Sequence, residues 1–270
     1  MSRRSLRSSL LLASLCGCAG EGVVVVRASG EAQATQGIAA AQFADGWAVR
    51  FEHLVVHVAD VAVGDAELPG GFLIDAAALP GTPPVVELGE VAVPLGRHDV
   101  AFAITPATSA ATPLHIDDGD DIAARVLDAG AAVYVEATAE QVDSAEVVTL
   151  TLALPTAVMH SDCTNGSTGK PGVVAATDGG GVADIVFHVE HLFYDTLGTE
   201  AARLRFAPIA AAAIDGHVDN DALAATPLDR RVYDAASFEV ASLFDFISLS
   251  VASLGHLGGS GLCTVSRFGA

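Results

Sequence analysis

The sequence predicts a mainly β protein, an antiparallel β-sandwich with a C-terminal helical cap. Three observations support this prediction: apolar residues alternate with polar ones in several short segments, glycine and proline separate those segments, and helical spacing of apolar residues dominates only in the last third. Hydrophobic residues make up 51% of the 270 residues, which is enough for a sizeable core. Short alternating strands at this spacing favour a sandwich over a parallel sheet.

The longest alternating segment covers residues 47–63 and predicts one long strand or two consecutive ones. Its odd positions run from Trp47 through His53 and His57 to Val63, and we expect them to face inward. Further elements are predicted as strands at Val100–Ile104, Val133–Ala137, Val148–Leu154 and Asp184–Phe193, and as a short helix at Asp120–Asp128.

The helical cap is expected over about residues 200–258. Helical segments are predicted at Pro208–Ala213, Asn220–Ala225 and Ala236–Leu254. The chain then divides into a signal peptide at 1–17, a tether at 18–45 and a single domain at 46–270. The tether is predicted because the residues after a brief valine run are small, polar and rich in alanine and glycine.

The first residues have the layout of a secretory signal, with three arginines before an apolar run that is too short to cross a bilayer. Leu15–Cys18 resembles a lipobox, in which a peptidase cuts before a cysteine that carries a diacylglyceryl group. The resemblance implies that Cys18 is lipidated and anchors the protein to a membrane, at the periplasmic face or at the outer membrane and cell surface. The alternative is an ordinary signal peptide cleaved near Ala19.

The chain is strongly acidic, with 33 acidic against 13 basic residues and a formal net charge of −20. Nucleic acids and anionic membrane surfaces are polyanions, so this charge argues against either as a partner. It permits cations. A solvated acidic surface that keeps a secreted protein soluble is the simpler explanation, and a protein partner remains an open alternative.

The cysteines predict one disulfide. Cys16 leaves with the leader and Cys18 carries the lipid, so Cys163 and Cys263 are left. In an oxidising compartment two remaining cysteines most simply pair with each other.

The disulfide also predicts a cluster of histidines, because His160 lies close to the first cysteine and His256 close to the second. His188, His191 and Asp162 are candidates to complete it. A group of imidazoles suits copper or zinc. His188 and His191 are three residues apart and would point to opposite faces of a regular strand, so only a bulge or turn would let them converge.

Calcium is the less favoured metal. The densest acidic run holds Asp117, Asp118, Asp120 and Asp121, and its oxygen donors suit a hard cation. The alternative is a solvated loop and helix start. The segment 211–222 resembles an EF-hand loop at Asp215, Gly216, Val218 and Asp219, but alanine replaces three of the usual donors, which implies a turn without calcium affinity.

Enzymatic motifs are not found: Ser260 lies in a glycine-rich stretch without a nucleophile elbow, and the sequence has no phosphate-binding loop and no HExxH motif. Four passages together, Gly46–Val63, Val91–Ile104, His191–Asp195 and Leu204–Phe206, resemble secreted lipoproteins of predatory and soil bacteria, a family without an assigned activity. The resemblance implies a similar fold and address and no particular reaction.

We therefore expect a lipid-anchored extracytoplasmic binding protein that holds a metal ion through its histidines, and not an enzyme. One alternative is a structural or interaction lipoprotein without a small-molecule ligand. The third is a secreted hydrolase.

Overall fold

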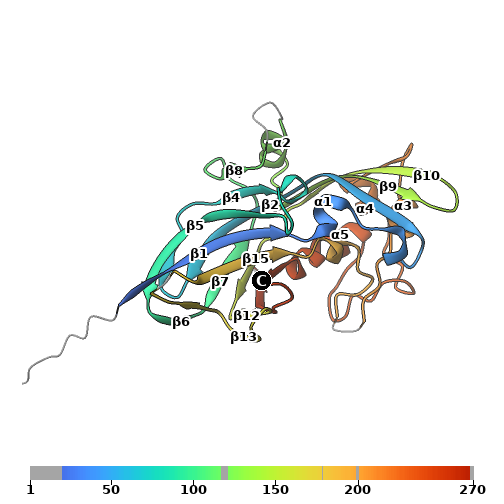
Figure 1. Cartoon of the computed structure of the whole chain (residues 1–270). Helices are drawn as coiled ribbons and strands as arrows, with labels where there is room; N and C mark the ends of the chain where they lie inside the picture. Colours follow the sequence, from blue (N-terminus) through green and yellow to red (C-terminus); the bar gives the residue numbers. More distant parts are fainter. Residues whose placement is uncertain (1–19, 117–120, 178, 199–200, 268–270) are drawn as a thin grey trace, which may run out of the picture.

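The computed structural model describes residues 20–116, 121–177, 179–198 and 201–267 and shows a mainly β protein, with 46% strand against 18% helix (Figure 1). The predicted fold class is confirmed, because two sheets rich in antiparallel pairs enclose one apolar core and short helices gather in the C-terminal part. The strands are β1 Glu21–Gly30, β2 Trp47–Val63, β3 Ala66–Glu67, β4 Phe72–Asp75, β5 Val85–Pro94, β6 Gly96–His98, β7 Val100–Ile104, β8 Thr112–Leu114, β9 Val133–Gln141, β10 Glu146–Leu154, β11 Val158–Ser161, β12 Thr164–Asn165, β13 Lys170–Pro171, β14 Val173–Ala175, β15 Gly181–Phe187, β16 His217–Asp219, β17 Gly255–Leu257 and β18 Thr264–Arg267. The α-helices are α1 Ala32–Gln36, α2 Ile122–Asp128, α3 Ala207–Ala210, α4 Asn220–Ala225 and α5 Leu243–Ser250, and the 3-10 helices are η1 Ala40–Gln42, η2 Ala76–Ala78, η3 Val189–Phe193 and η4 Val251–Ser253.

The larger sheet is built around β2, which pairs with β9, β7, β4 and β3. Its main path has the order β16-β10-β9-β2-β7-β11-β18, and apart from β16 on β10 the neighbours on that path whose register is given are antiparallel. The predicted strand at residues 47–63 is observed as one strand with the same limits.

Two bulges in β2 change which residues face the core. The pairing of β2 with β9 shifts between Phe51 and His53, so the core positions pass from the odd series to Leu54 and Val56. His53 and His57 alternate with this new set and lie on the opposite face of β2, so they do not face the main core, although His57 is buried. Period-two alternation predicts the strand, but a single inserted residue reverses its faces.

The opposite face of β2 is covered by α2, where a second apolar cluster forms. Ile122 and Val126 of α2 are fully buried there against Val55, Leu73 and Tyr134. The predicted helix is thus observed from Ile122 onward, and Figure 1 shows it standing on the outer side of the sheet.

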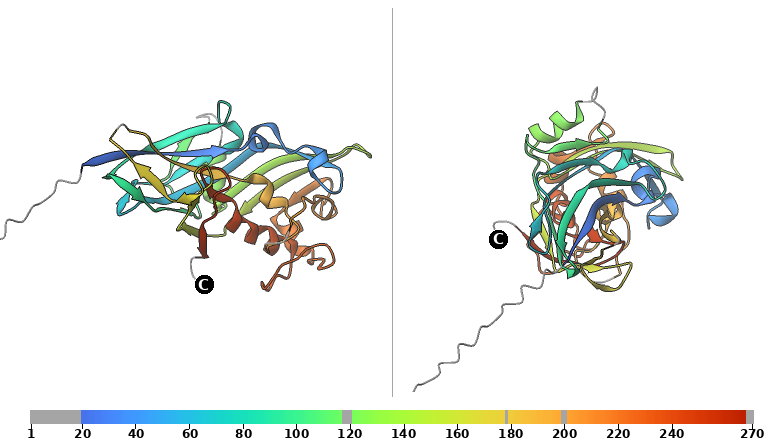
Figure 2. Two further views of the ribbon diagram at one scale, coloured as in Figure 1. Left: turned by 60° about the horizontal axis from the view of Figure 1, so that its bottom comes forward. Right: turned by 60° about the vertical axis from the view of Figure 1, so that its left-hand side comes forward.

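The smaller sheet has the order β17-β15-β1-β5 and places β1 in its interior. The prediction of a tether at 18–45 is therefore wrong from Glu21 onward. Val24 and Val26 of β1 have no exposed surface and belong to the main core. Their run of β-branched side chains suits a strand that is buried on its inner face, and neighbours on both edges satisfy its backbone. Figure 2 shows β1 running along the sandwich toward α1.

The C-terminal part is helical only in short pieces. The expected helix at Ala236–Leu254 is observed as α5 followed by η4, because Ser242 caps the first turn and exchanges hydrogen bonds with Asp245 in a capping box. The predicted strand at Asp184–Phe193 ends at Phe187, where η3 takes over after one residue. Among the described helices none combines the length and the apolar character needed to cross a membrane.

Candidate metal centre

The candidate centre lies where two neighbouring parallel strands end. β1 and β15 run parallel, and their pairing finishes with Gly30 opposite Phe187. The residue that follows β1 is Glu31 and the residue that follows β15 is His188, so the sheet register places these two side chains together. The distance from Nδ1 of His188 to Oε1 of Glu31 is 3.5 Å. Carboxyl ends of adjacent parallel strands are a common place for ligand sites.

A turn brings the second histidine to the same place. Because η3 begins directly after His188, the chain coils back, and the rings of His188 and His191 lie 5.3 Å apart. The sequence analysis required a bulge or a turn for these two histidines to converge, and the structure shows a turn. On the other side of β15, β17 pairs His256 with Val186, which puts the His256 ring 4.3 Å from that of His188.

Three of these side chains form a group that suits a metal ion. One donor atom each from His188, Glu190 and His191 lies within 4.8 Å of the others. Oε1 of Glu190 is 3.4 Å from Nδ1 of His188 and 4.0 Å from Nε2 of His191. All three are largely buried, with side chains 11%, 14% and 13% exposed, so water competes poorly for these donors.

The backbone determines which nitrogen of each imidazole is free. Nε2 of His188 lies 3.2 Å from the carbonyl oxygen of Gly259, and Nδ1 of His191 lies 2.6 Å from that of Ser253. A carbonyl only accepts hydrogen bonds, so these nitrogens carry the protons. The nitrogens left to bind a metal are then Nδ1 of His188 and Nε2 of His191, the two atoms next to Glu190. Without a metal, Nδ1 of His188 donates to Oε1 of Glu190 at 3.4 Å, and a bound ion would take the place of that proton. Hydrogen bonds such as those to the two carbonyls orient imidazole ligands in metal sites.

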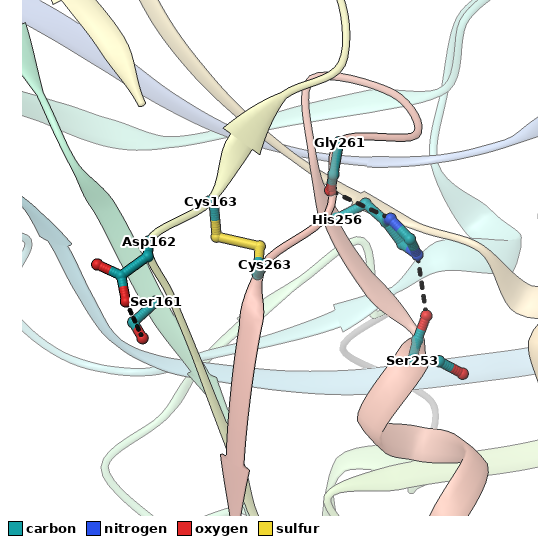
Figure 3. Close-up of a disulfide and its surroundings, with 7 residues drawn as sticks. All are labelled: Ser161, Asp162, Cys163, Ser253, His256, Gly261 and Cys263. Carbon is teal, nitrogen blue, oxygen red and sulfur yellow. Dashed lines mark hydrogen bonds between the residues drawn. A yellow bond between two sulfur atoms is a disulfide. The ribbon is translucent and has the colours of Figure 1, made fainter. Parts of the chain in front are cut away.

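His256 supports the group and is not a ligand in this arrangement. Its Nδ1 faces the carbonyl oxygen of Gly261 at 3.2 Å and its Nε2 that of Ser253 at 3.0 Å (Figure 3). Burial lowers the pKa of His256, so the ring is neutral and its single N–H donates to one of these two carbonyls, while the other nitrogen also faces a backbone oxygen. The carbonyl of Ser253 contacts His191 as well, so His256 helps to fix the backbone that orients His191.

The charges of Glu190 and His191 also suit a cation. Burial lowers the pKa of His191 to about 4, so its ring is neutral and able to bind a metal at pH 7. Burial alone would raise the pKa of Glu190, but the hydrogen bond from His188 and the nearby imidazoles lower it overall. Burial acts to lower the pKa of His188, yet Glu190, Glu31 and the Gly259 carbonyl raise it overall. Oε2 of Glu190 is buried and has no hydrogen-bond partner among the described residues.

Besides His256, two further predicted ligands lie outside this group. His160 is fully buried and stacks on Phe102, with ring centroids 4.5 Å apart. Neither ring nitrogen makes a well-formed hydrogen bond, so the ring acts as a flat apolar side chain. Asp162 is exposed in a left-handed turn beside Ser161, and the structure does not bring it to the histidines. The predicted proximity of His188, His191 and His256 is observed.

The predicted disulfide is confirmed. Cys163 and Cys263 are bonded, and they fasten the loop after β17 to the segment after β11 (Figure 3). The same loop is held by hydrogen bonds from Thr164 N to Leu262 O and from Gly166 N to Leu257 O. Since it carries the carbonyl of Gly259 that orients His188, the disulfide supports the candidate centre from outside.

Among the residues that the structure describes, the calcium candidates form no site. Asp117, Asp118 and Asp120 lie outside the described residues, and Asp121 is exposed and pairs with Arg125 at 2.8 Å. The EF-hand-like segment is a tight hairpin turn, with Asp215 and Gly216 at positive φ. Asp219 caps α4 by accepting a hydrogen bond from Ala222, in place of binding an ion.

Two acidic residues of the group were not predicted from the sequence. Glu190 lies between His188 and His191, and the compact pattern His-Val-Glu-His was a signal for it. Glu31 had no such signal, because its position depends on the parallel pairing of β1 with β15. These strands are far apart in the sequence: Arg27 of β1 contacts Asp184 of β15, 157 residues further along the chain.

The comparisons with known proteins add no family: the chain matches no family model, no curated protein and no solved structure. The interpretation of the centre therefore rests on its geometry.

The packing of His160 predicts a pH-dependent stability. Burial lowers the pKa of His160 to about 4, below the ordinary value of 6.5. The unfolded chain then binds a proton between these values and the folded chain does not, so stability falls as pH drops from 6.5 to 4, by roughly 3 kcal/mol for this residue. We expect His160→Phe to remove that part of the decline.

The measurement is urea unfolding at pH 7 and pH 4.5 in the presence of a chelator. Both proteins keep the contribution of His191, so the difference between them isolates His160. A decline as large as that of the wild type in both His160→Phe and a second variant, His160→Leu, would show that this ring does not titrate as its burial implies.

Proposed function

We propose that this protein is an extracytoplasmic metal-binding protein that holds one divalent ion through His188, Glu190 and His191. The observation that supports this most is the convergence of one ligand atom each from His188, Glu190 and His191 within 4.8 Å, with a backbone carbonyl orienting each imidazole through its other nitrogen. Glu31 adds a second carboxylate within reach of His188. A buried Glu190 oxygen without a partner is a further reason, since buried polar atoms are normally satisfied.

The donor set favours zinc or copper over calcium. Calcium takes six to eight oxygen ligands, whereas imidazole nitrogen suits zinc and copper. Two histidines and one glutamate are a known zinc set in sites that keep a coordination position open. The proposed centre therefore differs from an acidic surface that attracts any cation.

The test is titration of chelator-stripped protein, purified without a histidine tag, with Zn²⁺ and with Cu²⁺ in a calorimeter. We expect one ion per chain and a loss of affinity of at least about 100-fold in His191→Ala, because one of the donors that binds the ion directly is removed. Bound zinc is also expected to raise the free energy of unfolding by about 4 kcal/mol at 1,000 times its Kd.

The matched control is His217→Ala. His217 is exposed on β16 and contacts Thr149 at 2.9 Å, away from the centre, so the variant should bind the metal like the wild type. The proposal is contradicted if the wild type binds neither ion, or if His191→Ala and His217→Ala lose affinity equally. An interaction lipoprotein would then be the better interpretation.

The address is a separate proposal. We propose that Cys18 carries a lipid and holds the protein at a membrane outside the cytoplasm, for which the lipobox-like Leu15–Cys18 is the support. Cys18 lies outside the described residues. Cys18→Ala is expected to move the protein from the membrane fraction to the soluble fraction of cells, as followed by immunoblot. A variant that stays with the membranes would refute the lipid anchor.

A further inference from the structure

A cavity of about 510 Å³ opens beside the candidate centre, and Glu190 forms part of its wall. The other polar residues of the wall are Gln33, Gln42, Tyr194 and Arg203. A cavity of this volume lies in the range that holds a small organic molecule. The proposed ligand Glu190 therefore connects the metal to a space that a second molecule can enter.

The cavity wall is rich in hydrogen-bond donors. Among the described residues that line it, Glu190 is the one carboxylate and Arg203 the one cation. The Oε1 atom of Gln42 already accepts from the backbone N–H of Ala39, which leaves its amide N–H groups free to donate. The guanidinium of Arg203 is exposed and forms no ion pair within the described part of the chain, although the protein has a net charge of −20.

Tyr194 joins the cavity to the centre. Its ring lies 4.4 Å from that of His191, and its phenol forms no hydrogen bond with a described residue. Phe43 forms part of the apolar wall and is held in place by the rings of Phe193 and Phe206. The wall thus offers donors beside a rigid apolar surface.

We propose that the metal centre keeps one coordination position open toward this cavity and takes a small organic carboxylate there, with Arg203 pairing with the carboxylate. This inference rests on the proposed function. An ion bound by Glu190 neutralises that residue, so the loaded cavity presents the positive charges of the metal and of Arg203 and no free carboxylate. Guanidinium groups pair with carboxylates in a planar, two-pronged geometry, and a metal with three protein ligands accepts a further oxygen.

The experiment uses protein loaded with Co²⁺, whose visible spectrum reports any change in the atoms bound to the ion. Benzoate is the probe, and benzamide is its uncharged match in shape. We expect benzoate to change the cobalt spectrum at one site per chain and benzamide to leave it unchanged. Arg203→Ala should weaken benzoate binding by about 10-fold or more, because a charged hydrogen-bond partner is lost, while Arg203→Lys loses less.

The control is Arg50→Ala, which removes a guanidinium from the neighbouring cavity of about 760 Å³, where Glu190 is not part of the wall. That variant should bind benzoate like the wild type. Cobalt that binds without any spectral response to benzoate overturns the open position while leaving the proposed function intact. A benzoate affinity that is equal in Arg203→Ala and the wild type overturns the role of the cavity, and protein that binds no cobalt refutes the proposed function itself.

Discussion

Replacing both disulfide cysteines, Cys163→Ser with Cys263→Ser, is expected to lower the free energy of unfolding by about 4–5 kcal/mol. The bond joins residues 100 positions apart, and closing a loop of that length removes much of the conformational entropy of the unfolded chain. The measurement is urea denaturation of wild type and double variant in the presence of a chelator. Wild type that has been denatured, reduced and alkylated serves as the control and should behave like the variant.

The same variant is expected to weaken metal binding, because the freed loop carries the carbonyl of Gly259 that orients His188. A loss of 10- to 100-fold is typical when a group that orients a metal ligand is disturbed. A destabilisation below about 1 kcal/mol would show that the hydrogen bonds of Thr164 and Gly166 hold the loop without the disulfide.

Gly261→Ala is expected to destabilise the protein by at least about 3 kcal/mol, since over-packing against atoms that cannot move is among the costlier single changes. A Cβ at this position would clash with the carbonyl oxygens of Thr164 and Leu257, which are backbone atoms. The loop would have to leave the segment after β11, and the acceptor of His256 Nδ1 would leave with it. Thermal and urea unfolding measure the loss.

Gly259→Ala is the matched control in the same loop. A Cβ on Gly259 meets no atom within 4 Å, and its cost is only the strain of a positive φ of 87°, about 1 kcal/mol. Similar effects in the two variants would mean that the loop yields easily and that close packing against Thr164 does not hold it.

The strands were predictable where local periodicity decides them. β2, β7, β9 and β10 show alternating apolar residues in the sequence, and each is observed in its expected place. The faces of β2 were not predictable, because a bulge beside His53 reverses the alternation and depends on pairing with β9. β1 was not predictable, because its short valine run is followed by small, polar, alanine- and glycine-rich residues that are typical of a tether, and only its neighbours on both edges make it a core strand.

The candidate centre was predictable only in part, for a related reason. The cysteines implied that the segments around His160 and His256 lie close together, and the structure agrees. Which imidazole has a free lone pair depends on carbonyls such as that of Ser253, and backbone direction is not visible in composition or spacing. Glu31 required the parallel register of β1 and β15, a contact between distant segments that no local pattern encodes.

The position of β1 also sets a length scale. Only two residues separate Cys18 from Glu21, where the strand begins, and Glu31 follows directly after its end. Ten strand residues rise about 33 Å, and both edges of β1 are hydrogen-bonded along most of that path. If Cys18 carries the proposed lipid, β1 would act as a rigid spacer, and the proposed metal centre would lie at a nearly constant distance from the bilayer.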